Sequence, residues 1–374
     1  WNEHYGNIEK TSVEREDTRE YSNKSSRGGK EVKEKVLPGI SPFVFGKFLI
    51  QNTILVRLVD VWPDPVELVD VPTILVDMDE DLRVLYQEMV STFEKEIEER
   101  EDGFKLYLPL TETGISLPDN PFTYPEVTFT TDGVEEVIYS PRHLSEDRIL
   151  PKEAKLQEII KGEIAEGRAS IVYVRDTGSS REGRDVRPRL KKVLENVGAK
   201  VAILDASTTK PNRRSEWLKQ KVEKEGYNVI IVSQELVKVG LDLLCTPTLI
   251  FYQFSWSLFT INQAARRAWR IGQTKECRLF YLAYRDTYQE YMAQLIAMKN
   301  KASAAMSGEV SSEGLSAMLG DEGDLQSLLI KAIKEGTVVK GSTGEWTAAM
   351  SDRAREILAG IGKAKQPTVL EQFE

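Results

Sequence analysis

Apolar and polar positions form alternating blocks through the middle of the chain. Amphipathic helical patterns follow most of the short apolar runs, which lie at residues 170–174, 200–204, 228–232, 248–252 and 279–283. Runs that are apolar on both faces are typical of parallel strands that are covered on two sides. This alternation predicts an α/β domain with a doubly wound parallel sheet over residues 146–302.

Upstream of this domain the pattern first predicts a helix and then loses its period. After an extended stretch, apolar residues recur at helical spacing, at Leu82, Leu85, Tyr86, Met89, Val90 and Phe93. Such a stripe predicts an amphipathic helix that buries one side. Residues 101–145 carry prolines at irregular intervals, and TTDGVEEV resembles a hairpin. We therefore expect an irregular connection or a small insertion there.

The two ends of the chain have different patterns. Residues 1–38 are highly charged, and their few apolar side chains offset little of the entropy of ordering, so we expect a loop or disorder. Residues 303–374 alternate glycine and serine with short helical pieces, which predicts a small helical appendage. The pieces are GLSAMLG, DLQSLLIKAIKEG and SDRAREILAGIG.

Composition narrows the class of protein. The chain has 374 residues and a net charge of −9, with 41% hydrophobic and 29% charged residues, which is typical of packed soluble domains. No apolar run approaches the ~20 residues of a membrane span, and the polar N-terminus shows no secretion signal. We therefore expect a cytoplasmic protein without a membrane partner. The two cysteines and two histidines lie far apart and do not have the spacing of a structural zinc site.

An arginine cluster is unexpected in such an acidic chain. The segment NQAARRAWRIGQ follows Thr260, which can cap a helix in a capping box with Gln263. At about 100° per residue, Gln263, Arg267 and Arg270 share one helical face. Neighbouring guanidinium groups repel each other, so the cluster is expected to be solvated, paired with carboxylates, or a binding site for a multiply charged anion. The opposite face has residues suited to packing on a sheet, namely Ile261, Ala264, Ala265 and Ala268.

Three other segments offer hydrogen-bonding groups to a nucleotide or a phosphate. In SQELVKVGLDLLCTP, Gly240 permits close approach of the backbone, and Asp242 can accept hydrogen bonds from a ribose. LDASTTKPNRR places Ser207, Thr208 and Lys210 at the approach to a helix. RDTGSSREGRDVRPRLKK is rich in basic residues that could border a phosphate track. Each segment, taken alone, is more often an ordinary loop or a solvated face.

Taken in order, these segments resemble the second RecA-like lobe of superfamily 2 helicases, and most closely the SNF2-like branch. SIVYVRDTG looks like motif IV, IVSQELVKVGLDLLCTPTLIFYQ like motif V, and QAARRAWRIGQTKECRLFYLAYRDTYQEYM like motif VI with the helix after it. The match covers residues 150–300, approximately. Residues 40–95 resemble the stretch that joins the two lobes, so we expect residues 39–145 to hold the end of the first lobe and the linker. The sequences GLDLL and RRAWRIGQ look like those of a bacterial or phage-type variant of this family.

The resemblance implies a motor that binds ATP with Mg²⁺ between two lobes and moves along DNA, more often double-stranded. By motif position, Arg270 would be the principal arginine finger for the γ-phosphate, Arg267 its partner, and Gln263 a residue that orients the site. Arg266 would flank them, and Trp269 replaces the histidine of many relatives. Residues implied at the nucleotide ribose are Gly240 and Asp242. Residues implied at the DNA backbone are Ser207, Thr208, Lys210, Ser233 and Arg175.

The sequence departs from a complete motor. It contains neither G-x-x-x-x-G-K-[ST] nor D-E-x-H, so the phosphate loop and the magnesium carboxylates are missing. We therefore expect the C-terminal half of a helicase, whose first lobe is supplied in cis or on another polypeptide, and no appreciable ATP hydrolysis by this chain alone. The alternative is a non-catalytic DNA-binding or regulatory module, and a glycosyltransferase-like enzyme ranks lower. Partner proteins of a defence or mobile-element system are a further expectation.

Overall fold

The computed structural model describes ten stretches of the chain. They are residues 7–14, 30–37, 52, 58–62, 64–131, 133–178, 183–237, 241–306, 325–336 and 352–361. The chain divides into two compact units, one with Trp1–Val56 and Met298–Asp324 and the other with Arg57–Ala297 and Leu325–Glu374. No helix among the described residues is long and apolar enough to cross a membrane.

The first unit contains a hairpin that the sequence did not predict. Strands β1 (Asn7–Glu14) and β2 (Lys30–Leu37) pair antiparallel, where we expected a loop or disorder over residues 1–38. The register places Glu9 opposite Lys35 and Lys10 opposite Glu34.

The second unit is built on a seven-stranded sheet in which all the pairings are parallel. The strand order is β3-β11-β10-β7-β9-β8, and β4 also pairs with β11. This confirms the predicted doubly wound α/β fold. The strands are β3 (Leu68–Asp70), β4 (Ile74–Val76), β7 (Ser170–Val174), β8 (Val201–Leu204), β9 (Val229–Ser233), β10 (Thr248–Phe251) and β11 (Cys277–Tyr284).

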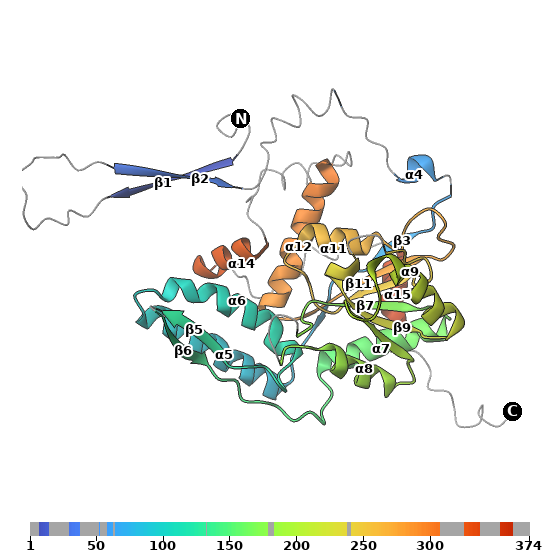
Figure 1. Cartoon of the computed structure of the whole chain (residues 1–374), viewed down its shortest axis with the longest axis horizontal. Coiled ribbons are helices and arrows are strands. Elements are labelled where there is room, and N and C mark those ends of the chain that lie inside the picture. The colour runs from blue at the N-terminus through green and yellow to red at the C-terminus, as the bar shows by residue number, and fades with distance from the viewer. Residues whose placement is uncertain are drawn as a thin grey trace, which may run out of the picture. The chain divides into compact units, whose positions relative to one another are not determined.

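Helices cover both faces of this sheet (Figure 1). Along β7, Val172 and Val174 face one core, and Ile171 and Tyr173 face the other, as the alternation of a strand requires. The first core contains residues of α7 (Pro151–Ala165), α8 (Arg187–Glu195) and α15 (Asp352–Gly360). The second contains residues of α9 (Arg214–Lys219), α10 (Gln234–Val237), α11 (Leu258–Ala265) and α12 (Tyr288–Met306).

Residues 57–145 belong to the same compact unit as the lobe. Strands β3 and β4 extend the sheet beyond β11, and the predicted stripe of α5 (Glu80–Glu99) is buried in the second core, with Val90 partly buried. The expected boundary at residue 146 lies inside this unit. Without β3 and β4, strand β11 would be an open edge of the sheet. The remaining elements here are α4 (Leu58–Val61), η2 (Gly103–Leu106), α6 (Tyr107–Ser116), η3 (Leu117–Asp119), β5 (Val127–Thr131) and β6 (Val134–Tyr139).

A buried ion pair joins the upstream region to the lobe. The Lys152 ammonium donates to the Asp119 carboxylate at 3.0 Å and to Gln289 Oε1 at 2.9 Å. Burial raises the pKa of Asp119 and lowers that of Lys152, while their mutual attraction opposes both shifts. Close by, Gly114 of α6 packs on Tyr288, because a Cβ there would lie 2.3 Å from the ring. These contacts fix α6 and η3 against the start of α7 and α12.

The expected C-terminal appendage is not separate from the lobe where it is described. Helix α14 (Leu325–Lys334) packs on α6, and α15 packs on the opposite face of the sheet with Ala354 fully buried. Both helices have apolar stripes, which must be covered to be stable in water. The predicted helical piece GLSAMLG lies outside the described residues.

Candidate functional site

The helix that begins the arginine segment is shorter than predicted. Its N-cap is Ser257, whose hydroxyl accepts the Thr260 backbone N–H at 3.2 Å. Thr260 lies inside the helix and donates to Glu235 at 3.2 Å, so the predicted capping box of Thr260 and Gln263 is wrong. The helix ends at Ala265 because tertiary contacts hold the residues that follow in a loop.

Two side chains hold that loop. The Trp269 indole N–H donates to the Val66 carbonyl at 2.7 Å. The Gln273 amide donates to the Ala268 carbonyl at 3.1 Å and to the Leu244 carbonyl at 3.2 Å. The motif VI segment is therefore joined to the residues upstream of β3 and to the end of the motif V loop. This role of Gln273 was not predicted from the sequence, although the residue ends the segment NQAARRAWRIGQ.

The alanine surface of the motif was predicted correctly. Ile261, Ala264, Ala265 and Ala268 are all buried in the second core. The Tyr173 hydroxyl of β7 donates to the Ala264 carbonyl at 3.2 Å, which fastens the end of α11 to the sheet. Small side chains allow the close approach of helix and sheet that this contact needs.

The arginines do not lie on one helical face, because Arg266, Arg267 and Arg270 all follow the end of α11. Arg266 and Arg270 are exposed, and neither forms an ion pair or a hydrogen bond through its side chain with the described part of the chain. Arg267 is half-buried. Burial raises the pKa of the Tyr173 hydroxyl, and the charge of Arg267 opposes that shift, which places Arg267 beside β7. Gln263 is half-buried on α11.

The motif V loop is described from residue 241, so the predicted contact residue Gly240 lies outside the described residues. The backbone N–H of Asp242 donates to Ser215 Oγ at 3.1 Å, and its carboxylate accepts the Leu244 N–H at 3.3 Å. Asp242 also lines a hollow of ≈ 390 Å³ beside α9, together with Lys219. One carboxylate oxygen is therefore used to shape the loop.

Three of the predicted DNA-contact hydroxyls are occupied within their own turns. The hydroxyls of Ser207 and Thr208 donate to the Asp205 carboxylate at 2.6 and 3.0 Å. These contacts, with the Ser207 hydroxyl first, hold the pKa of Asp205 below its usual value. Ser233 accepts the Glu235 N–H at 3.3 Å. Lys210 is exposed and has no carboxylate partner in the described part of the chain.

Arg175, predicted at the DNA backbone, lies among acidic and aromatic side chains of its own chain. Its guanidinium pairs with Asp176 at 3.2 Å and Glu112 at 3.6 Å and lies 5.4 Å from the centre of the Trp256 ring. Only 13% of its side chain is exposed. Sequence pattern could not detect this, because Glu112 and Trp256 come from distant parts of the chain.

A residue that the sequence analysis missed organises this carboxyl edge of the sheet. Gln253 follows β10, and its side-chain oxygen accepts the backbone N–H groups of Arg175 and Asp176 at 3.0 and 2.9 Å. Gln234, just after β9, donates to the Gln253 carbonyl at 2.6 Å. The available signal was position, since polar residues that directly follow neighbouring parallel strands meet at one edge.

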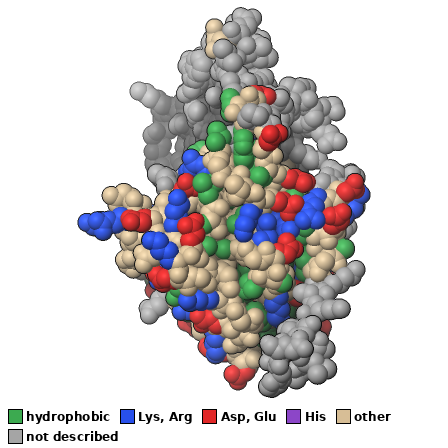
Figure 2. Space-filling model, turned by 90° about the vertical axis from the view of Figure 1, so that its right-hand side faces the viewer, with side chains coloured by type: hydrophobic (Ala, Val, Ile, Leu, Met, Phe, Trp, Pro, Cys, Tyr) green, Lys and Arg blue, Asp and Glu red, His purple; other side chains and the backbone are tan. Residues whose placement is uncertain are grey.

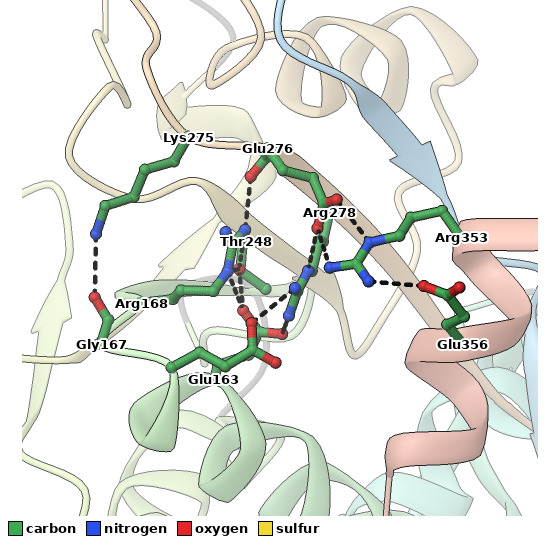
Figure 3. A network of polar contacts seen from close by, with 10 residues as sticks. Glu163, Gly167, Arg168, Thr248, Lys275, Glu276, Arg278, Arg353 and Glu356 are labelled. Atoms are coloured by element: carbon green, nitrogen blue, oxygen red, sulfur yellow. Dashed lines mark hydrogen bonds and ion pairs between the residues drawn. The ribbon is translucent and has the colours of Figure 1, made fainter.

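The opposite edge of the sheet holds a second arginine cluster (Figure 3). Arg168 and Arg278 both pair with Glu163 at 2.7 Å. Arg278 also pairs with Glu276 at 2.8 Å, and Glu276 in turn accepts Arg353 of α15 at 2.8 Å. Burial lowers the pKa of Arg278, but the neighbouring carboxylates outweigh it and the pKa is raised. This cluster is neutralised by its own carboxylates.

Charge is mixed over the face seen in Figure 2, where lysine and arginine side chains are interspersed with aspartate and glutamate. A uniformly positive surface would attract DNA from any direction. On the face shown, positive contacts with DNA would have to be local.

Parts of this chain are similar to known proteins. The model of the helicase conserved C-terminal domain matches residues 151–272. ATP-dependent helicase fft3 of Schizosaccharomyces pombe is 27% identical over 157 residues, 42% of this chain and 16% of that protein. ATP-dependent helicase FUN30 of Saccharomyces cerevisiae is 33% identical over 112 residues, 30% of this chain and 10% of that protein.

A solved structure has the same fold. The C-terminal part of the Fun30 ATPase domain superposes with a TM-score of 0.50 at 17% identity, over 73% of this chain and 99% of that chain. The curated relatives named above are eukaryotic proteins, so the expectation of a bacterial or phage-type variant is not supported. Residues 151–272 therefore match the helicase conserved C-terminal domain, and the chain shares the fold of the C-terminal part of the Fun30 ATPase domain. The chain spans less than a fifth of the length of the curated relatives named above.

Proposed function

We propose that this chain is the second lobe of an ATP-dependent DNA translocase and that Arg270 is its arginine finger. The observation that carries the proposal is the exposed guanidinium of Arg270, which has no ion-pair partner among the described residues and lies in a segment matched by the helicase domain. An exposed guanidinium without a carboxylate partner is ready to bind a phosphate oxygen through its planar fork. The relatives fft3 and FUN30 are named as ATP-dependent helicases.

Positioning of the finger comes from the contacts on each side of it. Trp269 is fixed to the Val66 carbonyl, and Gln273 to the Leu244 carbonyl. Arg270 lies between these two anchors, so its backbone is held, while its side chain makes no ion pair or hydrogen bond with the described part of the chain. Arg267, which is partly buried beside β7, would add a second positive charge closer to the sheet than that of Arg270. Gln263 and Asp242 would border the nucleotide.

ATP and Mg²⁺ would be held mainly by a first lobe, in cis or on another polypeptide. Residues 1–374 contain no phosphate-loop pattern, and no group of residues in the described stretches could hold a metal ion. The role of this chain is therefore to place a positive charge where negative charge develops on the transferred phosphoryl group.

Lys210 is the residue that we propose contacts the DNA backbone. It is exposed, has no carboxylate partner in the described part of the chain, and lies at the start of the 3₁₀ turn Pro211–Arg213. Arg175 is buried in ion pairs. Lys210→Ala in the assembled enzyme should lower DNA affinity several-fold and reduce the salt dependence of binding, because one phosphate contact is lost. A fluorescence titration with a DNA duplex at two salt concentrations measures both, with Lys155→Ala as a surface control. Unchanged affinity and unchanged salt dependence in Lys210→Ala would remove this residue from the DNA contact.

The main experiment measures ATP hydrolysis when this chain is joined to or mixed with a first lobe that carries a phosphate loop. We expect turnover that needs both parts and rises with DNA. Arg270→Ala should lower turnover by about 10³-fold or more, while ATP affinity changes little, because the finger acts in the transition state.

Arg266→Ala is the matched control, since Arg266 is also exposed and also has no ion-pair partner among the described residues. It should retain most of the turnover. Equal loss in both variants would show only a need for positive charge and would contradict the assignment to Arg270. No hydrolysis in any mixture, combined with intact DNA binding, would favour the non-catalytic DNA-binding module.

A further inference from the structure

A cavity away from the arginine segment has no part in the proposed function. It has a volume of ≈ 600 Å³ and lies between one face of α5, the turn from β11 into α12, and the end of α14. That volume is within the range of ligand-binding sites. Tyr86, Tyr288 and Tyr291 contribute aromatic rings to its lining.

The turn into α12 brings a buried carboxylate to this cavity. Glu290 is only 4% exposed, and its Oε2 accepts the backbone N–H of Asp286 at 2.7 Å. Asp286 adopts a left-handed conformation with φ 57°, and Glu290 closes the turn as a helix cap does. The second oxygen, Oε1, is buried and has no hydrogen-bond partner in the described part of the chain. A buried carboxylate oxygen left without a donor is costly, so this position favours a ligand that supplies one.

The charges that line the cavity are predominantly negative. The Arg285 guanidinium is already paired with Asp77 at 3.0 Å, and Arg83 donates to the Met78 carbonyl at 3.0 Å. Three carboxylates that line the cavity have no cationic partner among the described residues, namely Glu94, Asp286 and Glu290.

We propose that this cavity binds a lysine side chain from a basic segment of a partner protein. An ammonium group would donate to Glu290 Oε1, and its charge would be balanced by Glu94 and Asp286. Tyrosine faces favour a cation and suit the alkyl stem of lysine. DNA or a free phosphate is disfavoured by the excess of carboxylates, and the described residues include no cluster that could hold a metal ion. The volume exceeds one lysine side chain, so flanking residues of a peptide would also fit.

The test uses the full chain and the peptide Gly-Lys-Gly-Lys-Gly-amide, which carries a dye on its N-terminal amine so that both lysines stay unmodified. Fluorescence anisotropy should show saturable binding, and acetylating both lysines should weaken it at least about tenfold, because acetylation removes the charge. Glu290→Gln should weaken binding by about tenfold or more, since the buried oxygen would lose its charge. No saturable binding, or equal binding of the acetylated peptide, would overturn the proposal.

Two further variants separate local binding from folding and from general charge. Ser91→Arg fills the cavity from an exposed position of α5 and should also abolish binding, even if Glu290→Gln proves unstable. Glu158→Gln changes the net charge by the same amount on α7, outside the cavity, and should leave affinity within about twofold. Loss of binding in Glu158→Gln would point to non-specific attraction and would contradict the site.

A competition experiment with putrescine distinguishes the source of the ammonium group. Putrescine carries two ammonium groups without a peptide backbone. It should compete only at concentrations well above those of the peptide, because flanking peptide contacts contribute to binding. Putrescine that displaces the peptide at equal concentration would reassign the cavity to free diamines.

Discussion

Two arginine clusters of this protein show opposite chemistry. Around Glu163, the guanidinium groups of Arg168 and Arg278 are buried and paired with carboxylates at 2.7 Å. Beyond α11, Arg266 and Arg270 are exposed and have no carboxylate partner in the described stretches. The same residue type therefore stabilises the fold at one edge of the sheet and remains available to a ligand in the motif VI loop.

The difference comes from the neighbours and not from the spacing of the arginines. The paired cluster draws its carboxylates from α7 and from the residue before β11, and Glu276 also connects it to Arg353 of α15. In the motif VI loop, the nearest fixed contacts are made by Trp269 and Gln273, which are uncharged. An arginine is a candidate for anion binding where no internal acid neutralises it.

The largest effect is expected from Glu163→Gln. This change leaves Arg168 and Arg278 buried without their shared charge partner, and breaking a buried pair in this way costs about 3–5 kcal/mol. Urea unfolding of the full chain, followed by circular dichroism, gives the change in free energy. A loss below about 1 kcal/mol would mean that this cluster does not stabilise the fold. The paired arginines around Glu163 would then not differ in this respect from the exposed arginines of the motif VI loop.

A smaller, pH-dependent effect is expected from Glu276→Gln. Burial raises the pKa of Glu276, but hydrogen bonds from Arg353 and Arg278 outweigh it, so the pKa is lowered in the folded protein. A lowered pKa gives stability that is present above the usual value of 4.5 and is lost as the pH falls through the folded value. The variant should lose about 1 kcal/mol near neutral pH and show a flatter decline in stability below pH 4.5, approximately. An unchanged pH profile would contradict the role of Glu276.

The sequence predicted five strands of the sheet (β7 to β11), most helices and the buried alanine surface, because these depend on local periodicity. Strand β7 and helix α5 were predictable from apolar spacing alone. The recruitment of β3 and β4 to the sheet was not, because it depends on pairing with β11, more than two hundred residues later. The same holds for the hairpin of β1 and β2, whose charged sequence has a weak local signal.

The candidate site was predicted in composition but not in geometry. A helical period placed Gln263, Arg267 and Arg270 on one face, but long-range contacts end the helix at Ala265. Arg175 appeared to be a surface cation until Glu112 and Trp256 were placed beside it by the fold. Charge type is visible in a sequence, but the partner that neutralises a charge is a property of the tertiary structure.

The most direct test of the central claim is Arg270→Ala, measured for stability and for turnover in the same preparation. The account predicts a change in the free energy of unfolding within about 0.5 kcal/mol, because an exposed and unpaired side chain supports no internal contact. It also predicts that ATP turnover, assembled with a first lobe, falls by about 10³-fold or more. Near wild-type turnover, or a large loss of stability, would contradict the claim that this arginine is reserved for a ligand.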